Sequence, residues 1–149
     1  MRFMEIALEE ARCAGAVGEV PVGAVLVRNG EIIARAQNRT KRDRDPTAHA
    51  ELLALREGAR SLGTERLSDC DLYVTLEPCT MCAGAISHAR IRRLYYGALD
   101  EKGGAVDAGV RFFQQPTCHH APDVYGGLGE REASELLIGF FQARRSSQP

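Results

Sequence analysis

The sequence contains no apolar run that approaches the roughly 18 residues needed for a membrane-spanning helix. Its first residues also lack the uninterrupted apolar segment of a secretory signal, because Glu5, Glu9 and Glu10 break that stretch. Both absences argue against a membrane-spanning or secreted protein. We therefore expect a cytoplasmic protein without a membrane partner, in a compartment where thiols stay reduced.

Paired cysteines and an excess of positive charge are also missing. Five cysteines are an odd number, which argues against a disulfide framework. A formal net charge of −1 argues against a dedicated nucleic-acid-binding protein, since such proteins are usually basic overall. Any contact with nucleic acid must then rest on local basic patches, each of which can equally be solvated surface charge. These patches are Arg39, Lys41, Arg42 and Arg44; Arg90, Arg92 and Arg93; and Arg144 and Arg145.

The length and composition indicate one folded domain over residues 1–149. A chain of 149 residues with 44% hydrophobic and 26% charged residues is ordinary for a globular domain that buries a sizeable core.

Hydrophobic periodicity predicts an alternation of helices and strands. Asn29-Gly30 between two β-rich runs is a strong signal for a hairpin. The polar stretch 38–47 and the glycine-rich stretch 100–128 are expected to be loops, with a short strand near Val124. The predicted helices are 2–17, 48–62, 79–89 and 130–145, and the predicted strands are 20–27, 31–36, 71–76 and 92–98. This order predicts a single layered α/β fold.

Two short motifs carry the chemistry of the sequence. His49-Ala50-Glu51 and Pro78-Cys79-Thr80-Met81-Cys82 together offer an imidazole, two thiolates and a carboxylate that is not needed as a ligand. Three protein ligands with an open fourth position are typical of a catalytic zinc site. Zinc lowers the pKa of a bound water to about 7, and Glu51 can take the proton and later hand it on. The same pair of motifs is typical of zinc deaminases that act on cytosine or adenine.

The predicted elements can bring these residues together. His49 and Glu51 lie in the first turn of one predicted helix, and Cys79 and Cys82 begin another, where their spacing puts both on one face. Each helix follows a strand, so both begin at an edge of the sheet, where α/β proteins place their sites. Helix N-termini carry partial positive charge that stabilises thiolates. We therefore expect a single metal site with Glu51 beside it.

Each motif also has a plainer interpretation. A Cys-x-x-Cys pair alone can be a redox pair, and His49 alone can be a core or surface histidine. A closed structural zinc site would need a fourth ligand, which Cys118, His119 or His120 could supply. The intact Glu51 argues against a structural site, because such a site gains nothing from an unliganded carboxylate.

Longer stretches around the two motifs carry a family resemblance. They are Glu19-Val20-Pro21-Val22-Gly23-Ala24-Val25, Asn38-Arg39, the run 73–85, Arg90-Ile91, and Phe140-Phe141 followed by Arg144-Arg145. Together with the motifs, they closely resemble the bacterial tRNA-specific adenosine deaminases of the cytidine-deaminase-like superfamily. The zinc motif alone is shared by the whole superfamily, whereas the surrounding stretches narrow the likeness to this family. The similarity covers most of residues 3–145 and weakens from Glu101 to Gly127.

The resemblance implies a three-layer α/β/α fold with a mixed sheet of about five strands. It implies that His49, Cys79 and Cys82 bind one zinc ion per subunit and that Glu51 shuttles the proton. Zinc-activated water would attack C6 of the wobble adenosine in a tRNA anticodon loop, and ammonia would leave to give inosine.

Further residues match positions that contact substrate in the family. Asn38 matches an asparagine that pairs with the target base, although it can also be a turn former. The backbone around Ala48 and Glu77 would help to hold the base and the leaving group. Asp100 lies where the anticodon-loop backbone is contacted, or simply ends a strand. A carboxylate that accepts from a ribose 2′-OH favours RNA, so we expect no DNA partner.

The predicted last helix carries two aromatic and two basic residues that match anticodon-loop contacts. Aromatic rings stack on splayed bases, and guanidinium groups meet phosphates. At least one of the phenylalanines can instead belong to the core, because adjacent residues cannot both face it. The four residues are Phe140, Phe141, Arg144 and Arg145.

The resemblance further implies a homodimer in which both subunits frame the RNA site. The candidate interface is helix 79–89 with Arg90–Arg93, since Ala83, Gly84 and Ala85 permit close helix approach. Two rival functions stay open: a deaminase of a free base or nucleoside such as guanine, cytosine or cytidine, and a zinc-stabilised RNA-binding module without catalysis. The basic and aromatic residues favour the RNA enzyme over the first, and Glu51 favours it over the second.

Overall fold

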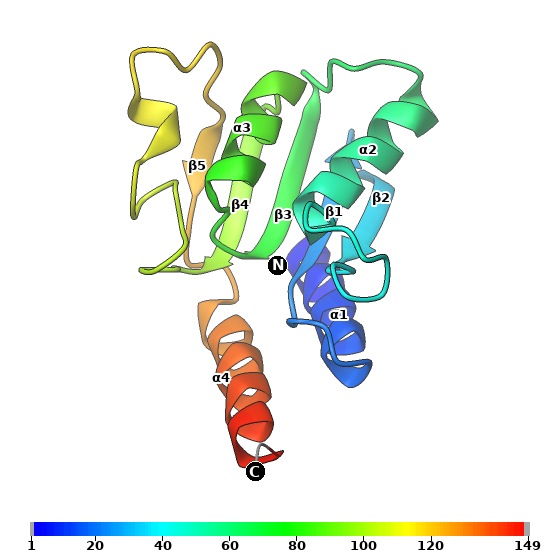
Figure 1. Ribbon diagram of the computed structural model, residues 1–149. Coiled ribbons are helices and arrows are strands. Elements are labelled where there is room, and N and C mark those ends of the chain that lie inside the picture. Colours follow the sequence, from blue (N-terminus) through cyan, green and yellow to red (C-terminus); the bar gives the residue numbers. More distant parts are fainter. Residues whose placement is uncertain (1, 148–149) are drawn as a thin grey trace.

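The computed structural model describes residues 2–147, which contain a five-stranded sheet with helices on both faces (Figure 1). The strands are β1 (Gly23–Arg28), β2 (Glu31–Gln37), β3 (Cys70–Leu76), β4 (Arg93–Ala98) and β5 (Asp123–Tyr125). The helices are α1 (Arg2–Ala16), α2 (Ala50–Leu62), α3 (Thr80–Ala89) and α4 (Glu130–Ser147), with a short 3₁₀ helix η1 (Phe112–Gln114).

The sheet is mixed and has the order β2-β1-β3-β4-β5. β1 runs antiparallel to both β2 and β3, whereas β3, β4 and β5 run parallel to one another. Leu76 and Ala98 are partners in the register of β3 and β4, so these strands end at the same edge. The chain enters α2 and α3 from this edge, which is the lower one in Figure 1.

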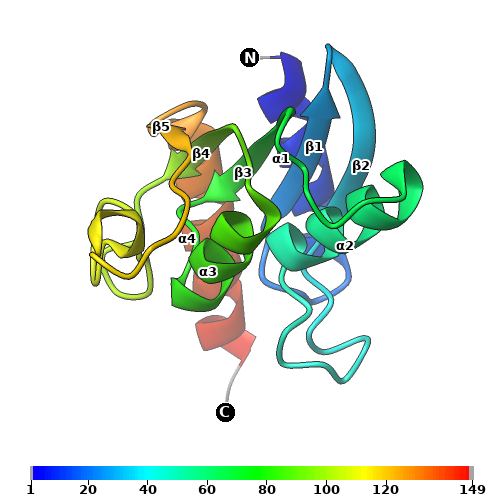
Figure 2. The same cartoon turned by 90° about the horizontal axis from the view of Figure 1, so that it is seen from above.

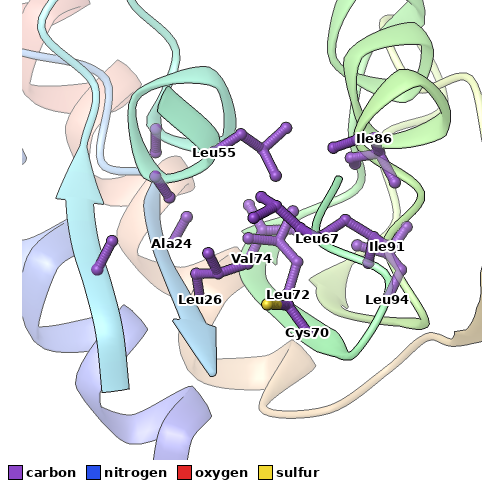
Figure 3. Packing of buried hydrophobic residues seen from close by; sticks show 14 of the residues in the cluster. Ala24, Leu26, Leu55, Leu67, Cys70, Leu72, Val74, Ile86, Ile91 and Leu94 are labelled. Carbon is purple, nitrogen blue, oxygen red and sulfur yellow. The ribbon is translucent and has the colours of Figure 1, made fainter. Parts of the chain in front are cut away.

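Two hydrophobic clusters fill the space between the sheet and the helices, one on each face. Figure 2 shows α2 and α3 on one side of the strands and α1 on the other. On the first side, Leu55 of α2 and Ile86 of α3 pack towards strand residues such as Leu72 (Figure 3). On the other side, Leu8 of α1 and Ala133 of α4 share the second cluster. These layers confirm the predicted three-layer α/β/α fold with a mixed five-stranded sheet.

Local sequence explains the elements that lead to the site. The buried residues of α1 recur every three or four positions, so one helix stripe faces the sheet. Asn29 and Gly30 both have positive φ angles, 51° and 77°, as the tight turn of a two-residue hairpin requires. Gly63 ends α2 in the left-handed conformation at φ 68°.

Several boundaries differ from the predicted ones. β1 begins at Gly23 instead of residue 20, because Pro21 has no N–H and the Val22 N–H bonds to the carbonyl of Val20. α2 and α3 begin at Ala50 and Thr80, one or two residues late. The helix η1 inside the predicted loop 100–128 was not expected, whereas β5 confirms the strand near Val124. Within residues 2–147, every helix is too short or too polar to traverse a lipid bilayer.

Candidate active site

Three side chains with soft or borderline donor atoms converge between the starts of α2 and α3. His49 and Cys79 occupy the N-cap positions of these helices with extended backbones, and neither side chain caps its own helix. The Nδ1 atom of His49 lies 3.6 Å from the Sγ atom of Cys79 and 3.4 Å from that of Cys82. The structure thus brings together all three predicted ligands.

The spacing of these atoms fits a zinc ion. Tetrahedral bonds of about 2.0 Å to nitrogen and about 2.3 Å to sulfur put such atoms about 3.5 Å apart, close to the separations found here. Within residues 2–147, the group whose ligand atoms lie within 4.8 Å of one another holds three residues, His49, Cys79 and Cys82. One imidazole and two thiolates are a zinc donor set with an open fourth position.

A hydrogen bond between the two thiols shifts their pKa values in opposite directions. The Cys82 thiol donates to Cys79, and with further help from His49 this lowers the pKa of Cys79 to about 4. The same contact with Cys79, together with burial, raises the pKa of the Cys82 thiol. The hydrogen bond with Cys79 raises the pKa of His49. Cys79 is therefore a thiolate at neutral pH, ready to bind a metal.

Glu51 lies in the first turn of α2, beside the three ligands. It is 4% exposed and lines the same pocket as His49 and Cys79. Burial raises the pKa of Glu51 to about 7, against the opposing attraction of His49. A carboxyl group with a pKa near the working pH can both accept and release a proton. This position suits the predicted proton shuttle.

Asn38 ties two walls of the pocket together. Its side-chain amide donates to the carbonyl oxygen of Val20 at 3.2 Å, and its Oδ1 atom accepts from the backbone N–H of Ala50 at 2.9 Å. The residue also lines the pocket, so it holds the loop and faces the substrate space at once. Ala48 is fully buried, and its carbonyl oxygen accepts the N–H of Arg39.

Asp100 follows β4 and turns the chain back towards the site. Its Oδ1 atom accepts from the backbone N–H groups of Lys102 and Gly103 at 3.2 and 3.0 Å. The side chain thus closes a strand-end turn, the plainer of its two predicted roles. Asp100 is half-buried and lines the pocket, so the turn also places it on the substrate side.

A small pocket over the metal site opens beside a wide groove. The pocket has a volume of about 240 Å³, and the neighbouring groove has about 920 Å³. The groove lies between α4 and the segment 99–103. Four residues line both spaces: Val20, Leu76, Asp100 and Gly103. The two spaces are therefore adjacent and share this wall.

The four α4 residues that were predicted to contact RNA divide between two surfaces. Phe141, 43% exposed, lines the groove together with Arg145. Phe140 is half-buried on the side of α4 that faces α1, and the guanidinium of Arg144 lies over its ring at 5.4 Å. Adjacent residues of a helix point in different directions, so Phe141 faces the groove and Phe140 faces a second surface hollow beside α1.

Two of the three residues offered as a fourth ligand, Cys118 and His120, are engaged elsewhere. The Cys118 thiol contacts the hydroxyl of Ser87 at 3.6 Å and the carbonyl oxygen of His120 at 3.1 Å. The ring of His120 bonds to the carbonyl oxygen of Ile91 at 2.7 Å. Neither residue belongs to the group of metal-ligating atoms described above. A closed structural site built from them is therefore disfavoured.

Sequence reasoning missed several residues that shape the pocket. The most informative is the side chain of Glu77, a residue of which only the backbone was expected to take part; it is buried and accepts backbone hydrogen bonds from the loop that follows β4. A charged residue at the end of an apolar strand, directly before Pro78, was the signal that could have found it. The other missed lining residues are Val20, Val22, Thr40, Leu76 and Gly103.

Comparison with known proteins gives consistent matches to this arrangement. The family model for the cytidine and deoxycytidylate deaminase zinc-binding region matches residues 1–98. The tRNA-specific adenosine deaminase of Agrobacterium fabrum is 66% identical over 143 residues, which are 96% of this chain and 94% of the relative.

Solved structures are similar in fold as well as in sequence. One comes from a study of A-to-I editing by tRNA:A34 deaminases at the wobble position of transfer RNA. It has a TM-score of 0.90 and 67% identity, over 91% of this chain and 99% of that one. A guanine deaminase from Bacillus subtilis has a TM-score of 0.66 and 35% identity, over 99% of this chain and 94% of that one.

Proposed function

The chain belongs to the family defined by the cytidine and deoxycytidylate deaminase zinc-binding region, and from this premise we propose that it deaminates the wobble adenosine of a tRNA anticodon loop to inosine. The substrate follows the relatives named as tRNA-specific adenosine deaminases. It also agrees with the arrangement of the pocket and the groove.

The observation that carries the proposal is that a pocket of the size of one base shares a wall with a wide groove. A pocket of about 240 Å³ lies below the roughly 300–1,000 Å³ typical of drug-sized ligands, which suits a single flipped base. The groove of about 920 Å³ then receives the neighbouring nucleotides. Its exposed Leu99, Ile138 and Phe141 offer apolar surface for unstacked bases. A free base would leave this groove without use.

The proposed chemistry assigns each site residue one task. His49, Cys79 and Cys82 hold zinc, which when bound lowers the pKa of a water so that a nucleophile exists at neutral pH. Glu51 accepts the proton from the attacking water and delivers it towards the purine and the departing amine. Asn38, fixed by its contacts to Val20 and Ala50, presents its remaining amide hydrogen and lone pair to the base.

The groove residues take the role of positioning the RNA. Phe141 stacks on a splayed base, and Arg145 meets a phosphate at the same wall. Phe140 and Arg144 act on the adjacent face of α4, where their stacked pair braces the helix and carries positive charge. Asp100 accepts a hydrogen bond from the RNA backbone, which favours RNA over DNA. Ala48 supports the base through the backbone that leads into α2.

The same proposal includes the oligomeric state, the domain organisation and the cellular location of the protein. Two copies pair through α3 and Arg90–Arg93, where the half-buried Gly84 and Ala85 leave room for a partner helix. Residues 1–149 form one domain built on one sheet, although residues 1 and 148–149 lie outside the described part. We place the protein in the cytoplasm, where reduced thiols are the rule, and all five cysteines, each within the described residues, are free.

One substrate panel tests the proposal. Zinc-loaded protein is incubated with an anticodon stem-loop that carries a wobble adenosine. Guanine, adenine, adenosine, cytosine and cytidine are assayed in parallel, and mass spectrometry identifies the products. We expect inosine in the RNA and no turnover of the free compounds. Turnover of guanine with inert RNA would contradict the proposal and align the chain with its guanine deaminase relative.

A further inference from the structure

The side chain of Glu77 makes contacts that the zinc chemistry does not use. Glu77 lies between the end of β3 and Pro78, and it is 2% exposed. Four backbone N–H groups donate to its carboxylate: those of Asp100, Val106, Asp107 and Ala108, at 3.0, 3.0, 2.7 and 2.9 Å. One carboxylate therefore holds both ends of the loop 100–108.

The fold of the loop depends on this carboxylate. Buried N–H groups need acceptors, and hydrogen bonds to an ionised carboxylate are stronger than neutral ones. A Cβ atom at Gly104 would lie 2.5 Å from the Glu77 carboxyl carbon and 2.5 Å from the carbonyl oxygen of Asp100. Only glycine lets the loop close over the side chain at this point. A second tie joins the Tyr96 hydroxyl to the carboxylate of Asp107.

The loop held by Glu77 forms the wall that the pocket and the groove share. Asp100 and Gly103 line both spaces, and Glu101 and Lys102 line the groove. The first part of loop 100–108, residues 100–103, thus forms the wall between the pocket and the groove. Glu77 reaches this wall from a position two residues before the ligand Cys79.

We propose that Glu77 is a positioning residue that holds loop 100–108 as the substrate-side wall and thereby sets the affinity for RNA. This inference rests on the proposed function, because it names the RNA as the ligand that the wall receives. The side chain acts through the backbone of the loop and does not touch the reacting atoms. Its loss should therefore loosen RNA binding while zinc and the chemical step are kept.

The matched pair of variants is Glu77→Gln and Asp71→Asn. The amide of Glu77→Gln keeps the size of the side chain but replaces one acceptor oxygen with an NH₂ group, which faces N–H donors. Asp71 is a carboxylate of similar burial, 8% exposed, at the other end of β3, where Arg92 pairs with it at 3.0 Å. Both changes replace a buried carboxylate, one within β3 and one directly after it, but only the first touches the loop.

Two measurements are made on the zinc-loaded variants and the wild type. Amide hydrogen exchange follows the N–H groups of Asp100, Val106, Asp107 and Ala108. In Glu77→Gln we expect these amides to exchange at least about tenfold faster. Steady-state deamination of the stem-loop should show a KM raised about tenfold with kcat within about threefold. Zinc content should stay at that of the wild type, and Asp71→Asn should change neither the loop amides nor KM.

The outcomes separate this inference from the proposed function. Unchanged exchange in Glu77→Gln, or faster exchange with unchanged KM, would overturn the role of Glu77 even if the wild type edits RNA. A fall in kcat alone would overturn it as well. A wild type that is inert on RNA would instead refute the proposed function and the RNA affinity assigned to Glu77, while the exchange data would still decide whether Glu77 holds the loop.

Discussion

The metal centre and the groove lie next to each other, but they differ in which parts of the chain form them and in how exposed their side chains are. The centre comes from two short motifs at helix starts, and its ligand Cys82 is fully buried. The groove is assembled from segments as distant as Val20 and α4, and its side chains Ile138 and Phe141 are 57% and 43% exposed. The buried side chains at the helix starts thus make the metal centre, whereas exposed side chains line the groove.

The metal centre and the groove should respond differently to substitutions. A substitution in the metal centre should reduce zinc binding, catalysis or stability, because the buried side chains there join the starts of two helices. A change in the groove should alter substrate binding and leave zinc and the fold intact.

The largest effect is expected for Cys79→Ser. Loss of a thiolate ligand should abolish zinc binding, and the protein should also be destabilised, because the site ties α2 to α3. Metal analysis, calorimetry and a deamination assay measure the three losses. Cys13→Ser is the matched control, since Cys13 is exposed on α1. Normal zinc content in Cys79→Ser would contradict the ligand assignment.

Glu51→Ala should separate chemistry from metal binding. Without the proton shuttle, kcat should fall by about 10²- to 10⁴-fold, while zinc content stays normal because Glu51 lies outside the ligand group. Glu57→Ala on the same helix is the control, since Glu57 is exposed and pairs with Arg60. Metal loss in Glu51→Ala would mean that Glu51 is a ligand.

Phe141→Ala tests whether the groove contributes to RNA binding. Loss of one stacking partner costs about 1–3 kcal/mol per base, so KM for the stem-loop should rise roughly 5- to 150-fold, with zinc content and Tm near those of the wild type. Phe140→Ala should raise KM less, because Phe140 lies outside the groove, on the side of α4 that faces α1. Equal effects on KM would remove the distinction between the two rings.

The two arginines of α4 should differ in their effect on RNA binding, as the two phenylalanines do. Both substitutions weaken RNA binding, but Arg145→Ala should weaken it more, because Arg145 lines the groove while Arg144 lies over the Phe140 ring. Loss of one phosphate contact should reduce the slope of log K against log salt by about 0.7. Fluorescence titrations at several salt concentrations measure these slopes. An unchanged slope in Arg145→Ala would put the phosphate contact elsewhere.

The smallest effect is a pH dependence of stability at Glu19, which holds the loop 38–47 beside the pocket over the metal site. Burial acts to raise the pKa of Glu19, but hydrogen bonds from Arg42 and Lys41 outweigh it and hold the pKa below its ordinary 4.5. The contribution is therefore complete above pH 4.5 and is lost as pH falls through the folded-state pKa. Glu19→Gln should cost about 1 kcal/mol at neutral pH.

Thermal unfolding across pH checks this sign. The difference in Tm between wild type and Glu19→Gln should shrink as the pH falls below 4.5. A difference that grows in acid would mean that the carboxylate is not the stabilised form. Because Glu19 pins the loop that carries Thr40 into the pocket, a modest rise in KM should accompany the change.

The order of the elements and the metal centre could be predicted from the sequence because their signals are local, whereas the three-layer fold with a mixed sheet was implied by the family resemblance. Hydrophobic periodicity gave the order of the elements, and the spacing of His49, Cys79 and Cys82 gave the ligands. The pocket wall could not be predicted in the same way. Glu77 and loop 100–108 meet through backbone N–H groups, which leave no pattern of residue types. The division of Phe140 from Phe141 likewise depends on how α4 packs against α1.

The most direct test of the separation between centre and groove is kcat/KM for a wobble adenosine as its RNA context is shortened. The series runs from the anticodon stem-loop through shorter oligonucleotides to free adenosine, with wild type and Phe141→Ala compared at one zinc loading. We predict a stepwise fall in kcat/KM for the wild type and a shallower fall for Phe141→Ala, since that variant has already lost part of the groove. Free adenosine turned over as efficiently as the stem-loop would contradict the account.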